Sequence, residues 1–99
     1  MTVRERTEKV VLRAMQDTNQ QLPPQSRLEI SLEAVLFGPS GRLDSLGLVN
    51  LIMEVEQGIQ DEFSNSITLA DEKALSQKNS PFLTARTLID YVVTLLEAR

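Results

Sequence analysis

The strongest constraint on the fold is an apolar pattern of helical spacing that runs from about Ser45 to Phe63. Its members recur three or four positions apart and therefore fall on one face of a helix; they are Leu48, Leu51, Ile52, Val55 and Ile59. The turn-forming residues Gly38-Pro39-Ser40-Gly41 precede the pattern. We therefore predict a helix of about five turns that buries this face against the rest of the chain.

A second apolar stripe, formed by Leu46, Val49 and Met53, lies beside the first on the same predicted helix. A helix at the surface of a small domain needs only one apolar stripe to face the core. The second stripe therefore either joins the core or forms an exposed apolar patch next to Ser45, and the sequence leaves both interpretations open. Gly58 lies within the pattern and should weaken the helix by roughly 1 kcal/mol relative to Ala.

The first helix is predicted from about Val3 to Thr18. Thr2 and Glu5 have the spacing of a capping box, in which each side chain accepts a hydrogen bond from the backbone N–H of the other residue. Pro23-Pro24 prevents the helix from continuing, because proline lacks an N–H donor and clashes with the preceding turn.

A last helix is predicted near the C-terminus. Its apolar face comprises Leu88, Ile89, Val92, Leu95 and Leu96. Two starts are compatible with the sequence: Ser80-Pro81, which fits an N-cap followed by a first-turn proline, and Thr84, which is also a preferred cap. A short helix from Thr68 through Ser76, capped at its first residue, is predicted to precede it.

The connection over residues 20–44 fits more than one kind of secondary structure. Leu28, Ile30 and Leu32 alternate, which is typical of a short strand, whereas 31–37 also fits a helical turn. A connection of this length is usually packed by its own apolar residues. We expect those to be Leu28, Ile30, Leu32, Val35, Leu36 and Phe37. The whole pattern predicts one all-α domain over residues 1–99, with three longer helices, one short helix and a long first loop.

The composition excludes several classes of function. The 99 residues include no Cys and no His, which removes disulfides, the usual zinc ligands and the base of a Ser-His or Cys-His catalyst. The net charge of −4 disfavours binding to nucleic acid. No apolar run is long enough to span a membrane, and the N-terminus is charged from Arg4 onward rather than signal-like. We expect a cytoplasmic monomer that binds no metal.

The tripeptide Asp44-Ser45-Leu46 stands at the start of the long predicted helix. Leu36-Phe37-Gly38 precedes it, and Phe63 and Ile67 follow it with the spacing Phe-x-x-x-Ile. Together with the order of helices, and with Thr87-Leu88-Ile89-Asp90-Tyr91-Val92 in the last one, these motifs make the chain resemble an acyl carrier protein. The resemblance extends over about residues 3–96 and implies the four-helix bundle of that family.

The resemblance implies a function in which the chain is not itself an enzyme. In the family, the serine that matches Ser45 carries 4′-phosphopantetheine from coenzyme A, attached by a phosphopantetheinyl transferase. The thiol of that arm holds an acyl or aminoacyl group as a thioester. The implied partners are a loading ligase and a downstream acyltransferase or synthase of a fatty acid, polyketide, lipid or cell-envelope pathway. Asp44 and Leu46 are the implied flanks of the attachment motif.

The resemblance also implies that partner enzymes dock on the second helix. The implied docking residues are Leu46, Val49, Met53, Glu54 and Glu56. Between Leu43 and Glu72 the sequence contains several carboxylates but no Lys or Arg, which fits a surface read by basic partners. A solvated helix face would have the same charge pattern, and it remains the alternative for each carboxylate.

The chain departs from carriers of fatty acid synthesis at two positions. Those carriers usually have an acid two residues after the serine and another a turn later, where this chain has Gly47 and Asn50. A glycine after Asp-Ser-x resembles carriers of D-alanine, so a D-alanyl or other aminoacyl or peptidyl cargo is an alternative. An alternative of another class is an unmodified helical adaptor, in which Asp44 and Ser45 serve only as helix caps.

Overall fold

The computed structural model describes residues 2–37, 41–64, 66–69 and 82–98, apart from the side chain of Ser45. These residues form the helices α1 (Val3–Asn19), α2 (Ser45–Phe63) and α4 (Ala85–Glu97) and a 3-10 turn, η1 (Pro24–Ser26). Within these ranges there is no strand, only an isolated antiparallel bridge between Val35 and Thr84. The all-α prediction is therefore confirmed, and the bounds predicted for the second helix are those of α2.

The short helix predicted from Thr68 through Ser76 falls largely outside the described residues. Residues 66–69 are described and are not helical. None of the helices in the described part of the chain combines the length and apolar character needed to cross a membrane.

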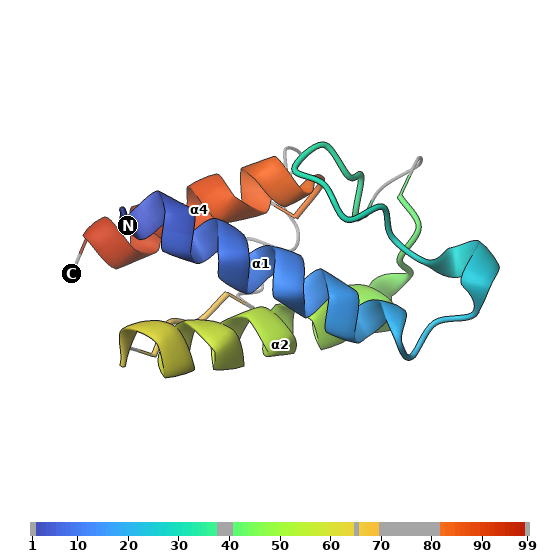
Figure 1. Cartoon of the computed structure of the whole chain (residues 1–99), viewed down its shortest axis with the longest axis horizontal. Helices are drawn as coiled ribbons and strands as arrows, with labels where there is room; N and C mark the ends of the chain where they lie inside the picture. The colour runs from blue at the N-terminus through green and yellow to red at the C-terminus, as the bar shows by residue number, and fades with distance from the viewer. Residues whose placement is uncertain (1, 38–40, 65, 70–81, 99) are drawn as a thin grey trace.

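Helix α1 packs against both α2 and α4. Figure 1 shows that α1 runs in the opposite direction to the other two helices. As a result, the starts of α2 and α4 lie at the same end of the molecule as the connection that follows α1 (Figure 1). The molecule measures 37 × 27 × 20 Å along its principal axes.

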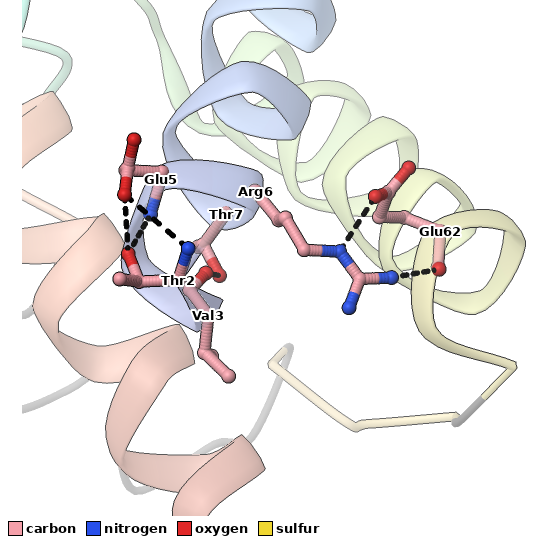
Figure 2. A network of polar contacts seen from close by, with 6 residues as sticks. All are labelled: Thr2, Val3, Glu5, Arg6, Thr7 and Glu62. Atoms are coloured by element: carbon pink, nitrogen blue, oxygen red, sulfur yellow. Dashed lines mark hydrogen bonds and ion pairs between the residues drawn. The ribbon is translucent and has the colours of Figure 1, made fainter.

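Side-chain caps begin the first and last helices. The capping box predicted for α1 is present: the Thr2 hydroxyl accepts the Glu5 N–H at 3.1 Å, and the Glu5 carboxylate accepts the Thr2 N–H at 3.2 Å (Figure 2). At α4 the cap is Thr84, whose hydroxyl accepts the Thr87 N–H at 3.1 Å. Of the two starts that the sequence allowed, the structure therefore selects Thr84.

The core is aliphatic, with Phe82 as its one fully buried aromatic side chain among the described residues. All five members of the predicted core stripe of α2 are buried. The largest fully buried side chains of the three helices are Val11, Met15, Leu51, Ile52, Val55, Ile59, Leu88, Ile89 and Val92. Phe63 and Ile67 pack against this core while remaining partly exposed.

Gly58 marks the point where α2 approaches α1 closely. A Cβ atom built on Gly58 would lie 2.7 Å from Cγ1 of Val10. Val10 is β-branched and has little rotamer freedom in a helix, so it cannot move aside at low cost. The glycine thus lowers helix propensity but permits this helix contact, and its place in the helix has a structural reason.

Arg6 of α1 holds the C-terminal end of α2 (Figure 2). Its guanidinium donates to the Glu62 carboxylate at 2.8 Å and to the Glu62 backbone carbonyl at 2.7 Å. It also lies 4.3 Å from the centre of the Phe63 ring, within cation–π range. Arg4 forms an ion pair with Asp90 and so links α1 to α4 in a similar way.

The connection after α1 is irregular and is neither the strand nor the helical turn considered from its sequence. At its start, the Asn19 side chain donates to the Leu28 carbonyl at 2.9 Å and accepts the Leu28 N–H at 2.7 Å. Leu28 and Leu36 are buried as predicted, but Ile30 and Val35 are 37% and 39% exposed. The prediction that Ile30 and Val35 pack inward was therefore wrong. The backbone hydrogen bonds described in the next paragraph determine which side chains of this connection face the core.

The end of this connection is attached to the start of α4. The Leu36 N–H donates to the Leu83 carbonyl at 2.7 Å, and the Ala85 N–H donates to the Ala34 carbonyl at 3.0 Å. Arg86 forms a hydrogen-bonded ion pair with Glu33, and this contact raises the pKa of the Arg86 guanidinium.

Candidate functional site

Ser45 is the first residue of α2, and the cap of this helix is Asp44. Oδ1 of Asp44 accepts the Gly47 N–H at 2.7 Å, and the Asp44 carbonyl accepts the Leu48 N–H at 2.9 Å. Capping was the structural alternative for both Asp44 and Ser45. The structure assigns it to Asp44, so the fold does not require a hydroxyl at Ser45 for this purpose.

Two buried leucines hold the start of α2 in place. Leu43, just before the cap, and Leu48, in the first turn, are 6% and 2% exposed. The Leu43 N–H donates to the Leu36 carbonyl at 3.1 Å, and Leu36 is itself bonded to Leu83 before α4. The position of Ser45 is thus determined through the backbone by the long connection and the last helix together.

Gly47 lies directly against the cap. An added Cβ would be 3.2 Å from Oδ1 of Asp44 and 3.2 Å from Cδ2 of Leu43, closer than most real contacts of such atoms. A side chain at this position would therefore press on the cap. This gives a structural reason for a glycine where the resembling family often has an acid.

Arg42 is the cation nearest to Ser45 in the sequence. Its guanidinium donates to the Gln25 carbonyl at 3.0 Å, in the 3-10 turn η1. This hydrogen bond links Arg42, which immediately precedes Leu43, to the first part of the connection over residues 20–44. It could not be predicted from the sequence, because its two partners are seventeen positions apart.

The second apolar stripe of α2 is exposed to solvent at its first and last residues. Leu46 is 70% exposed and Met53 is 59% exposed, whereas Val49 between them is partly buried. The three residues, hereafter the α2 patch, begin at the residue after Ser45. They extend along the helix for about 10 Å, at a rise of about 1.5 Å per residue.

The two carboxylates predicted to join this surface lie on opposite flanks of α2. Oε2 of Glu56 accepts the Leu69 N–H at 2.6 Å and so holds the segment that follows α2. Glu54 instead lines a groove of about 470 Å³ between α1 and α2, together with Lys9 and Arg13. The structural role of Glu56 had no signal in the sequence, because its partner is a backbone group.

A second hollow, of about 280 Å³, lies next to the α2 patch. It is lined by Met53, Glu56, Gln57, Gln60, Ser66 and Ile67. Among the residues that the structure describes, no three or more His, Cys, Asp or Glu side chains lie close enough together to hold a metal ion.

The geometry presents one serine at a capped helix start, beside exposed apolar side chains. No family model, curated protein or solved structure that we compared with this chain matches it.

Proposed function

We propose that this chain is a carrier protein that holds an acyl or aminoacyl group on a 4′-phosphopantetheine arm attached to Ser45. The observation that carries the proposal is the arrangement at the start of α2, where Asp44 supplies the cap and Ser45 occupies the first helical position. A serine there is available for modification without loss of the cap. The resemblance of Asp44-Ser45-Leu46 and its flanks to the acyl carrier proteins adds the identity of the group.

A phosphodiester fits this position for a physical reason. The first N–H groups of a helix have no partner within the helix, and they carry a partial positive charge. The Gly47 N–H is engaged by Asp44, which leaves the N–H groups of Ser45 and Leu46 to face an anion. Neither Gly47 nor Asn50 adds a negative charge on the first turns of the helix.

The proposed modification needs no catalytic group in this chain. The Ser45 oxygen would attack the phosphorus that carries the pantetheine in coenzyme A, a new O–P bond would form, and the pyrophosphate bond would break. Adenosine 3′,5′-bisphosphate would leave, and the serine proton would pass to the transferase. The thiol of the attached arm then supplies the thioester chemistry that a chain without cysteine lacks.

The proposed partners follow from this function. They are a phosphopantetheinyl transferase, a ligase that loads the cargo, and an acyltransferase or synthase that accepts it, within a fatty acid, polyketide, lipid or cell-envelope pathway. We propose that they dock on α2 beside Ser45, that the bundle is the four-helix type of the acyl carrier proteins, and that the protein acts as a cytoplasmic monomer. Gly47 and Asn50 keep a D-alanyl, other aminoacyl or peptidyl cargo as an alternative to acyl cargo.

The experiment that tests the proposal is intact-mass spectrometry before and after incubation with coenzyme A and a broad-specificity transferase. We expect the parent chain to gain one phosphopantetheine and Ser45→Ala to gain none. Ser26→Ala, in the turn η1, is the matched serine control and should be modified like the parent. Absence of a mass gain in the parent, under conditions that modify a known carrier, would contradict the proposal.

An unmodified helical adaptor is the second candidate, and the exposure of Leu46 and Met53 favours it. Such an adaptor would bind its partner through the α2 patch and would not need the Ser45 hydroxyl. Because Asp44 supplies the cap, Ser45→Ala should fold normally and separate the two functions. The adaptor would keep full partner binding in this variant, whereas the carrier would lose its function completely.

A further inference from the structure

We propose that Arg42 binds the phosphodiester that joins the arm to Ser45, with its guanidinium held in position by the Gln25 carbonyl of η1. The inference rests on the proposed carrier function and deepens it, because it assigns a residue of this chain to the phosphate. The resemblance to the acyl carrier proteins gives Arg42 no role. The inference comes from the contacts of Arg42 and from the charges around the start of α2.

A phosphodiester on Ser45 would place a negative charge next to a carboxylate. Asp44, the preceding residue, is exposed, and its Oδ1 accepts the Gly47 N–H at 2.7 Å. This hydrogen bond leaves the charge of the carboxylate in place, so the two anions would repel each other. The start of the helix offsets the repulsion only in part, because it supplies roughly half an elementary charge. A full positive charge nearby would therefore stabilise the modified chain.

Arg42 is the residue that can supply this charge. It stands three positions before Ser45, and the sequence contains no other Lys or Arg from Leu43 to Glu72. Three residues of fully extended chain span at most about 11 Å, which limits the distance between the Cα atoms of Arg42 and Ser45. The long side chain of an arginine at such a separation can reach a phosphate carried by the serine.

The backbone on either side of Leu43 directs Arg42 and Asp44 toward the same side. Leu43 is 6% exposed and belongs to the core, whereas Arg42 and Asp44 are both exposed. Asp44 has an extended backbone, with φ of −82° and ψ of −177°. Successive side chains alternate along an extended chain, so residues two positions apart share a side. Arg42 thus lies on the solvent side of the segment that leads into α2.

The contact with η1 positions the guanidinium and leaves most of its donors for another acceptor. Nη1 of Arg42 donates to the Gln25 carbonyl at 3.0 Å. None of the ion pairs in the described part of the chain includes Arg42, so it is not paired with Asp44. A guanidinium carries several N–H donors in a planar fork that matches two phosphate oxygens. A guanidinium that is already held in place loses less conformational freedom when it binds the phosphate.

The phosphodiester would therefore connect two segments that are far apart in the sequence. It would be attached to the first residue of α2 and paired with Arg42, which is bonded to η1. Attachment of the arm should then stabilise the fold, although it adds a negative charge beside Asp44. Without Arg42, the attraction of the helix start and the repulsion by Asp44 should nearly cancel.

The test compares the thermal unfolding of each protein before and after complete modification, with intact mass as the measure of completeness. In about 0.05 M NaCl, modification should raise the Tm of the parent by about 2–4 °C. The gain should fall by about half or more in 0.5 M NaCl, because salt screens exposed charges. Arg42→Ala should gain less than about 1 °C on modification. Arg42→Lys should lie between the two, since an ammonium group keeps the charge but lacks the planar fork.

The matched control is Arg27→Ala, in the same connection. Nε of Arg27 donates to the carbonyls of Asn19 and Leu22 at 3.0 Å and 3.2 Å, so this variant also removes arginine contacts with backbone carbonyls. It should lower the Tm of both forms by the same amount and leave the gain on modification unchanged. If Arg27→Ala reduced the gain as much as Arg42→Ala does, loosening of the connection would explain the effect, and the inference would be overturned.

A second measurement needs no substitution and decides the question even if Arg42→Ala resists modification. Nuclear magnetic resonance of the 15N-labelled parent follows the exchange of each guanidinium Nε–H with water. Modification should slow this exchange at Arg42 severalfold and leave it unchanged at Arg27. Unchanged exchange at Arg42, or an equal gain in Tm in the parent and Arg42→Ala, would overturn the inference while leaving the carrier function intact. Absence of any mass gain in the parent would overturn both.

Discussion

The two halves of α2 differ in what their outward and lateral side chains contact. Residues 54–63 contact the rest of the domain: Glu56 accepts the Leu69 N–H, Glu62 is paired with Arg6, and the lack of a side chain at Gly58 allows Val10 to approach closely. In residues 45–53 the lateral positions are uncharged, and Leu46 and Met53 extend into solvent. Both halves bury the same core stripe. The difference indicates that lateral contacts of the second half help to secure the helix in the bundle, whereas Leu46 and Met53 of the first half remain exposed to solvent.

The sharpest way to break this comparison is to disturb the close approach at Gly58. Gly58→Val should destabilise the fold by about 2 kcal/mol, because its side chain would overlap Val10. Urea unfolding measures the change. In the double variant with Val10→Ala, part of the loss should return, with a coupling of about 1 kcal/mol in the double-mutant cycle. Strictly additive effects would show that the Val10 contact does not explain the glycine.

Removing the cap tests what secures the first half. Asp44→Ala should cost about 1 kcal/mol, because the Gly47 N–H would lose its acceptor. Asp44→Asn keeps a side-chain oxygen and should cost only a few tenths of that amount. Thermal unfolding compares the two variants. Equal stability of Asp44→Ala and the parent would place the cap elsewhere and weaken the argument that Ser45 is free for modification.

The Arg6 clamp should contribute somewhat less, because both partners are partly exposed to solvent. Arg6→Ala should lower the free energy of unfolding by about 0.5–1 kcal/mol. Arg13→Ala, on the same helix, is the matched control and should change it by less than about 0.5 kcal/mol. Urea unfolding of both variants at low and high salt is the measurement, and the Arg6 effect should shrink as salt is added. If Arg6→Ala and Arg13→Ala had the same free energy of unfolding, the contact between Arg6 and Glu62 would not explain how the second half of α2 is held in the bundle.

The smallest effect on stability is expected in the α2 patch. Leu46→Ala/Met53→Ala should change the free energy of unfolding by less than about 0.5 kcal/mol, because both side chains are mostly exposed in the folded protein. A large loss of stability in thermal unfolding would mean that the patch supports the fold, and the contrast between the two halves of α2 would fail.

Much of the fold was predictable from local signals. The capping box of Thr2 and Glu5 was found from two residues three positions apart, and the bounds of α2 followed from its apolar spacing. Such signals depend on neighbours within one helical turn, so the sequence contains them directly. The choice of Thr84 over Ser80-Pro81 as the last cap was not predictable, because both satisfy the same local rule.

Only part of the candidate site could be predicted. The sequence placed Ser45 at the start of a helix and identified Leu46, Val49 and Met53 as a stripe, but it could not say whether that stripe was buried. It also grouped Glu54 and Glu56 into one acidic surface, although the two side chains point to different neighbours. Attachment of a cofactor to Ser45 is a prediction that rests on the resemblance, and the mass-spectrometry experiment tests it.

By itself, the sequence determined the bounds of α2, the start of α1 and which stripe of α2 faces the core, because periodicity and capping act within a few residues. Tertiary structure decided which groups are free and which are engaged. Glu56, Arg6 and Gly58 acquired their roles from partners 13, 56 and 48 positions away along the chain. Contacts at such separations depend on how the helices cross. The exposure of the α2 patch beside Ser45 is likewise a consequence of which neighbours cover it.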